Sequence, residues 1–142
     1  MSTILQVVQQ IQATAATWTS VEHVYTYPPE SINEPGLVAL VYAGGANHVG
    51  STCSPLDRMT STETIVVELL WPRAYGVAVI MEKSYAYLNS VPPALINDTT
   101  LRDLIFAISS IDRKFPWQRK HDGINHLGIR WDVKVRMDSS LT

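Results

Sequence analysis

The stretch Tyr25–Gly45, which reads Tyr-Thr-Tyr-Pro-Pro-Glu-Ser-Ile-Asn-Glu-Pro-Gly-Leu-Val-Ala-Leu-Val-Tyr-Ala-Gly-Gly, decides the fold. Pro28 and Pro29 fix φ and remove backbone donors, so a strand must end there and the chain must turn. Leu37 to Ala43 is apolar almost without interruption. Such a run is typical of a strand that is covered on both faces or central in its sheet.

The segment before this turn predicts one helix and one strand. Apolar residues recur at helical spacing from Thr3 to about Ala16, and Ser2 or Thr3 can cap the helix. Val21 to Tyr27 alternates in the manner of a strand with one face more buried than the other. The apolar face of the helix is predicted to comprise Ile4, Leu5, Val8, Ile11 and Ala15.

Residues 44–62 predict a loop longer than the ordinary connection in a compact domain. Loops of this length are usually functional, so we expect it to be held by a partner, or else to pack on its own subunit. It contains Cys53, the only cysteine of the chain, which excludes an internal disulfide and is interpreted as a structural thiol.

The second half of the chain predicts further elements. Thr64 to Trp71 is a strand with Ile65, Val67 and Leu69 on one side, and Pro72 closes it. Ala74 to Asn89 has helical period, and Pro92-Pro93 are expected to prevent its continuation, with a short turn from Pro93 to Ile96. Leu104 to Ile111 fits either a strand or a helix, whereas Leu127 to Met137 alternates cleanly as a half-buried strand.

These elements predict the α+β class: a mainly antiparallel β-sheet with two main helices packed on one face, in a single domain spanning residues 1–142. No apolar run approaches the length of a membrane span, and Met1-Ser2-Thr3 lacks the basic start of a signal peptide. We therefore expect a soluble protein made in the cytoplasm, with no membrane partner.

Charge is distributed unevenly along the chain. Residues 1–71 carry one cation, Arg58, against six acidic residues, a sum of −5, whereas residues 72–142 carry ten cations against seven acids, a sum of +3. A mixed, neutralised surface is the simpler interpretation, and a bipolar subunit that binds its neighbour head to tail is the alternative. Because the cations are scattered and the total is acidic, we expect no sequence-specific nucleic-acid binding.

Candidate catalytic chemistry is sparse. His121, Asp122 and His126 could supply metal ligands, but they lie around a Gly-containing turn and match no established zinc spacing. The glycines near Gly44 and Gly50 lack the lysine of a phosphate-binding loop. The sequence predicts no catalytic residue, no metal, no cofactor and no enzymatic activity.

Trp117 is the most suggestive aromatic residue. It follows Phe115-Pro116 and is flanked by cations, and aromatic residues together with arginine are typical of interface hot spots. The predicted interface residues are Arg113, Lys114, Trp117, Arg119 and Lys120, to which we add His48 and Arg58 from the 44–62 segment.

The order of features resembles the tail-terminator (tail-completion) proteins of long-tailed siphophages, the lambda-like minor tail protein U type. The resemblance covers nearly the whole chain except Asn47 to Thr62, and it also favours a strand for Leu104 to Ile111. It lies in the N-terminal helix, the Tyr27-Pro28-Pro29-Glu30-Ser31 turn, the Pro35–Tyr42 strand with Gly44-Gly45, Pro72-Arg73, Asp98-Thr99-Thr100-Leu101, and Gly123 to Trp131.

This resemblance implies a structural virion protein without an active site. It implies a ring, expected to be a homohexamer, that caps the head-proximal end of the tail tube, stops its polymerisation and joins it to the head connector. The expected partners are therefore other copies of the chain, the tail tube protein and a head-closure protein, in the virion tail or neck after assembly in the host cytoplasm. A head-closure or neck connector subunit, a small metal-dependent hydrolase using His121, Asp122 and His126, and a monomeric ligand-binding module are the alternatives.

Overall fold

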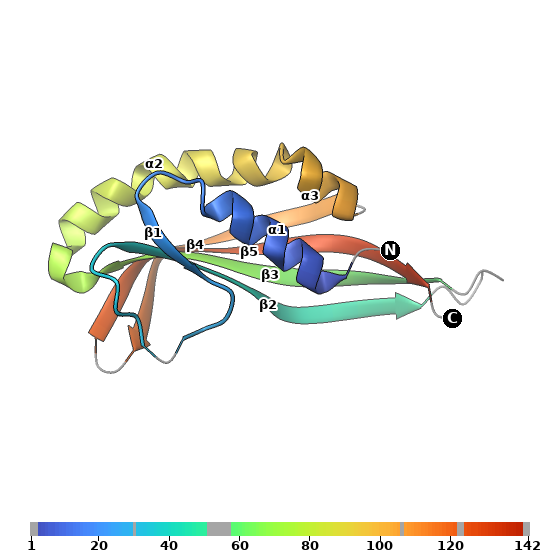
Figure 1. Cartoon of the computed structure of the whole chain (residues 1–142), viewed down its shortest axis with the longest axis horizontal. Helices are drawn as coiled ribbons and strands as arrows, with labels where there is room; N and C mark the ends of the chain where they lie inside the picture. Colours follow the sequence, from blue (N-terminus) through green and yellow to red (C-terminus); the bar gives the residue numbers. More distant parts are fainter. Residues whose placement is uncertain (1–2, 30, 51–57, 106, 122–123, 141–142) are drawn as a thin grey trace.

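The computed structural model describes residues 3–29, 31–50, 58–105, 107–121 and 124–140, with the backbone alone at 46–50, 58–60, 121, 124–125 and 138–140. One five-stranded sheet in the order β1-β2-β3-β5-β4 forms one layer, and the helices lie together on one of its faces (Figure 1). The elements are α1 (Ile4–Ala15), β1 (Val21–Tyr25), β2 (Leu37–Gly50), β3 (Arg58–Pro72), the 3-10 turn η1 (Arg73–Tyr75), α2 (Val77–Ile96), α3 (Thr99–Leu104), β4 (Ala107–His121) and β5 (Ile124–Ser140).

All strand pairs are antiparallel except β1–β2, which is parallel. Parallel neighbours need a connection that returns the chain to the starting end of the sheet. Here the Pro-rich segment that follows Tyr25 makes the return, and its Ile32 packs on Val38, Leu40 and Leu70, on the sheet face opposite the helices. The turn predicted from Pro28 and Pro29 therefore belongs to a crossover that covers part of this second face.

The main core lies between the sheet and the helices. Because successive strand residues point to opposite faces, each central strand contributes alternate residues to it. The buried members from the sheet include Leu37, Ala39, Val41, Ile65, Val67, Leu69, Ile129, Trp131, Val133 and Val135, and the helices contribute Val7, Val8, Ile11, Ala15, Ile80, Val91, Leu95 and Leu101. Burial of this apolar surface is the main term that stabilises the fold.

Helix α1 is fixed at both ends of its length by polar contacts. Thr3 caps it in a capping box, in which the Thr3 hydroxyl accepts from the Gln6 backbone N–H and the Gln6 side chain accepts from the Thr3 backbone. Asp98 caps α3 through the backbone N–H groups of its first turn and also accepts hydrogen bonds from Thr14 Oγ1 at 2.6 Å and Gln10 Nε2 at 3.1 Å. Asp98 thus joins the two short helices.

The predicted fold class is confirmed, as are the Thr3 cap, the two faces of residues 64–71 and the alternation of residues 127–137. The strand predicted from Leu37 to Ala43 is covered on both faces only from Leu37 to Val41, because Ala43 is exposed. The face of α1 is partly wrong. Leu5 is 61% exposed, whereas Val7 is fully buried, because the buried arc of the helix runs through Val7, Val8 and Ile11.

The predicted loop at residues 44–62 is wrong for most of its length. β2 continues to Gly50 and β3 begins at Arg58, with Asn47 opposite Thr62 in register. A register shift between Ala43 and Ala46 carries the ladder past the glycines, and β5 pairs with the other side of β3. Because β3 forms backbone hydrogen bonds with both β2 and β5, this segment is a strand in spite of its polar composition. Cys53 lies outside the described residues.

The predicted end of the second helix is also wrong. α2 continues through Pro92 and Pro93 to Ile96, so the separate turn expected from Pro93 does not exist. Prolines remove helix hydrogen bonds at a cost of about 3 kcal/mol. Val91 and Leu95, both buried against the sheet, offset that cost. The segment Leu104 to Ile111, which fitted either a helix or a strand, belongs to both, since α3 ends at Leu104 and β4 begins at Ala107.

Candidate interaction surface on the open sheet face

The candidate site lies on the face of the sheet opposite the described helices. The Pro-rich crossover covers its β1–β2 side, while the β5–β4 side presents charged residues that alternate with the core residues of the same strands. The described charged side chains joined by ion pairs on this side include Glu68, Lys114, Arg119, Arg130, Asp132, Lys134 and Asp112.

Glu68 is the centre of this surface. It sits in the middle of β3, between apolar neighbours, and its side chain is fully buried. Arg119 binds it in a bidentate manner, with Nε 3.0 Å from Oε1 and Nη2 2.7 Å from Oε2. Tyr42 Oη donates to Oε2 at 2.7 Å, and Trp117 Nε1 donates to Oε1. Four donors from β2 and β4 therefore converge on one buried carboxylate of β3, as a buried charge requires.

A β-bulge aims Trp117 at this carboxylate. Phe115 packs against the helix-side core, yet Trp117, two residues further along the strand, packs on the opposite face. Regular alternation would place both on one face, but the register between β4 and β5 shifts between Lys114 and Trp117. Gly128 lies opposite Trp117 in the ladder.

Two cations stack against the indole of Trp117. Arg130 Cζ lies 4.8 Å and Lys114 Nζ 5.7 Å from the ring centroid, within the range of cation–π attraction. Asp132 holds both, with Oδ1 2.8 Å from Arg130 Nε and Oδ2 3.6 Å from Lys114 Nζ. We call Tyr42, Glu68, Trp117, Arg119 and Arg130, with the rim residues Lys114, Asp132 and Lys134, the Trp117 platform.

Burial and hydrogen bonding raise the pKa values of two donors in the platform, Tyr42 and Arg119. Burial and the hydrogen bond to Glu68 raise the pKa of Tyr42 to about 12, so the phenol remains a donor. Burial acts to lower the pKa of Arg119, but its hydrogen bonds and charge pairing with Glu68 outweigh that effect and raise it. Tyr42 and Arg119 therefore both stay protonated near neutral pH and both donate to the Glu68 carboxylate.

This arrangement can recognise a protein surface. Aromatic residues and arginine held rigidly, with charged side chains at the rim, are the typical composition of interface anchors. Rigid side chains lose little conformational entropy on binding. Lys114 and Lys134 at the rim have side chains 52% and 47% exposed and remain accessible to a partner.

The structure brings together three of the predicted interface residues, Lys114, Trp117 and Arg119. Arg113 lies opposite the core residue Trp131 in the ladder, so strand alternation directs it to the other face, and Lys120 likewise points away from Arg119. His48 pairs with Ser61 and Arg58 with Ser140 in the β2–β3–β5 ladders, but their side chains lie outside the described residues. The interface role of all seven residues stays a prediction.

Sequence reasoning missed Glu68, Tyr42 and Arg130. One signal was available for Glu68, because it is the only charged residue between Thr64 and Trp71, in a strand predicted to be buried. A buried carboxylate needs partners. The identity of those partners depends on strand order, which places β2 on one side of β3 and the β5–β4 hairpin on the other.

The candidate metal ligands fall partly outside the described residues. Asp122 is not described, His121 is described by its backbone alone, and His126 is buried in β5. Among the side chains that the structure describes, no group of three or more His, Cys, Asp or Glu residues is placed to hold a metal ion. No described helix is long and apolar enough to cross a bilayer.

Neither a comparison with protein-family models nor a search of curated proteins returned a match to this chain.

Proposed function

We propose that this chain is a structural subunit of a bacteriophage virion, one that forms a ring at the head-proximal end of the tail tube, terminates tail polymerisation and joins the tail to the head connector. The proposal combines the resemblance of the sequence to siphophage tail terminators with the α+β architecture of the chain. Its partners would be further copies of itself in a homohexamer, the tail tube protein and a head-closure protein.

The Trp117 platform is the observation that carries the proposal. A fully buried carboxylate holds four donors, and so fixes Trp117 and Arg119 beside exposed cations on a sheet face that none of the described helices covers. Such a surface suits stable docking between rigid proteins. We assign this surface to the contact with the tail tube or the connector, because the subunits of a structural assembly must hold their neighbours in a fixed orientation.

The helix layer offers a second, chemically different surface. Tyr75, Val77 and Val79 are exposed around the start of α2, and Tyr85 is exposed further along that helix. Exposed apolar side chains close to one another mark contact surfaces more often than isolated ones do. A subunit that joins two different partners needs two different faces, and the charged sheet face and this apolar helix end meet that need.

Negative-stain electron microscopy of tails assembled with and without the protein tests the proposal. Uncapped tubes of uncontrolled length in its absence, restored to uniform capped tubes on addition, are expected of a terminator. Uniform tails that fail to join heads would indicate a head-closure subunit instead. Tails and head joining that are both unaffected would refute the virion proposal.

The platform is tested in the same assay by reversing its rim charges. Lys114→Glu combined with Lys134→Glu leaves the buried network intact and should abolish capping. The matched control is Lys114→Arg combined with Lys134→Arg, which keeps both positive charges at the same positions and should leave capping unchanged. Equal capping by both variants would remove the platform from the docking surface.

A further inference from the structure

Both edges of the sheet are open along the part of the chain that the structure describes. β4 pairs only with β5, and β1 pairs only with β2. An edge strand presents backbone N–H and C=O groups that can pair with another chain, and proteins usually cover or disrupt such an edge. Each edge is also bordered by a groove, which exposes apolar side chains beside the free backbone.

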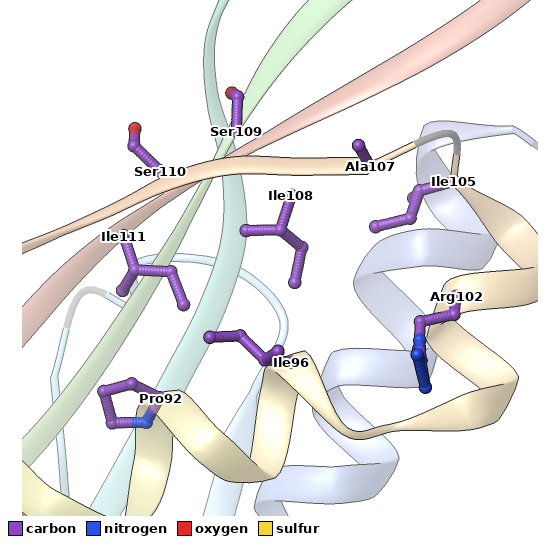
Figure 2. A pocket seen from close by; sticks show the side chains of 9 residues that line it. All are labelled: Pro92, Ile96, Arg102, Ile105, Ala107, Ile108, Ser109, Ser110 and Ile111. Atoms are coloured by element: carbon purple, nitrogen blue, oxygen red, sulfur yellow. The ribbon is translucent and has the colours of Figure 1, made fainter.

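The groove beside β4 has a volume of about 740 Å³ and lies between that strand, the end of α2 and α3. Ile108 and Ile111 point into it from the strand and Ile96 from α2, while Ser109 and Ser110 point away (Figure 2). Arg102 stands at its border. The helix-side apolar residues of β4 are therefore only partly covered by their own subunit.

The groove beside β1 has a volume of about 490 Å³ and lies between that strand and α1. Val21 and Val24 line it on the helix side and are also only partly buried. Gln12 Nε2 approaches the Val24 carbonyl at 3.5 Å, the limit of a hydrogen bond, so the side chain covers this edge weakly. Glu22 lies along the same groove.

We propose that β4 of one copy pairs with β1 of the next copy, so that the two grooves merge into one apolar seam and the sheet continues around the ring. This inference rests on the proposed function and names its subunit interface. Because β1 runs parallel to β2 while every later pair is antiparallel, β1 and β4 run in opposite directions. Copies related by a ring rotation therefore meet as antiparallel strands, with both helix layers on the same side.

Charge favours this pairing over a symmetric one. Arg102 borders the β4 groove and Glu22 the β1 groove, and no lysine or arginine occurs before Arg58 in the sequence. Pairing β4 with β1 opposes unlike charges, whereas β4 with β4 would bring two Arg102 side chains to one seam. Contacts between two different patches are also those that close a ring rather than a two-fold dimer.

Thiol cross-linking tests the seam. In a Cys53→Ser background, His23→Cys on β1 is combined with Ser109→Cys or Ser110→Cys on β4, which covers two registers. Treatment with a short bismaleimide should give a ladder of covalent multiples in the double variants and none in the single variants. Glu82→Cys combined with His23→Cys is the collision control, and circular dichroism checks folding. Arg102→Glu should reduce the ladder, and Arg102→Lys should retain it.

The outcomes separate this inference from the proposed function. Dimers formed by a single β4 cysteine would overturn it in favour of symmetric β4 pairing. Self-association seen by light scattering without a ladder would overturn the seam and leave a ring with another interface. A protein that stays monomeric and gives no ladder would overturn the seam as well, and the tail-capping assay would then decide the proposed function independently.

Discussion

Glu68→Gln is the substitution that most directly tests the buried network of the Trp117 platform. The replacement keeps the shape of the side chain but removes its charge and turns one acceptor oxygen into a donor. Trp117 Nε1 and Arg119 Nε both donate to Oε1, so the amide nitrogen would take the Oε2 position. There it faces Arg119 Nη2, which can only donate, so one guanidinium donor loses its acceptor in either orientation.

The magnitude follows from the burial of the pair. Removing one partner of a buried ion pair costs about 3–5 kcal/mol, because the other charge is left without compensation. The Arg119 side chain is 21% exposed, so water can replace part of the lost interaction. We therefore expect the lower end, about 3 kcal/mol, which corresponds to a fall of roughly 10 °C in Tm for a domain of this length.

Urea unfolding followed by far-UV circular dichroism measures the free energy of unfolding. Glu82→Gln, on the exposed side of α2, is the matched control and should change it by less than about 0.5 kcal/mol. Arg119→Met provides a double-mutant cycle. Once the guanidinium is gone, Glu68→Gln should cost less than it does in the wild type, which is a coupling between the two sites.

Two results would refute this reasoning. If Glu68→Gln changed stability no more than Glu82→Gln, the carboxylate would not carry the network. If Glu68→Gln and Arg119→Met were additive, the bidentate pair would contribute nothing beyond its separate parts, and the rigidity assigned to the platform would have no basis.

Three further predictions concern single positions. At Asp98, burial raises the pKa of the carboxyl, but hydrogen bonds from α1 side chains and from the amides of its own helix outweigh burial and lower it. The contribution of Asp98 to the free energy of unfolding should therefore be present above the unfolded pKa and lost as pH falls through the folded pKa. Asp98→Asn should flatten the dependence of the urea midpoint on pH between pH 7 and pH 3, and an unchanged slope would contradict this. A Cβ at Gly128 would lie 1.8 Å from the Leu69 carbonyl oxygen, so Gly128→Ala should lower the free energy of unfolding by about 3 kcal/mol, measured by thermal unfolding. Gly45→Ala is the control and should be close to neutral, because a Cβ there would have no atom within 4 Å. Equal effects of the two substitutions would disprove the close approach. Burial and the Glu68 carboxylate raise the pKa of Tyr42 to about 12. The contribution of Tyr42 to the free energy of unfolding is therefore present below the unfolded pKa and should be lost as pH rises from about 10 to about 12. In Tyr42→Phe the urea midpoint should fall less over this alkaline range than in the wild type, and an identical profile would count against the hydrogen bond.

The errors in the predicted elements share a physical cause. α2 passes through Pro92 and Pro93 because burial of Val91 and Leu95 outweighs the lost backbone hydrogen bonds. The β2–β3 hairpin extends past Gly45 because the backbone of β3 pairs on both sides, whatever the polarity of its side chains. In both cases a long-range interaction overrode a correct local signal.

The candidate site shows the same division. Sequence composition singled out Trp117 with its neighbouring cations, but it could not separate Lys114 and Arg119, which join the platform, from Arg113 and Lys120, which point away from it. That separation depends on the face each residue takes in β4. A single bulge changes those faces, and no local residue pattern specifies where the bulge falls.

The sequence by itself determined the α+β class, the capped first helix, the doubly covered start of the strand at residues 37–41 and the alternating last strand, because each follows from local periodicity or from the backbone chemistry of single residues. Only the tertiary structure decided that Glu68 meets Tyr42, Trp117 and Arg119, and that β1 and β4 form the two open edges. Those contacts depend on strand order and register. Both are set by packing and pairing between segments far apart in the chain.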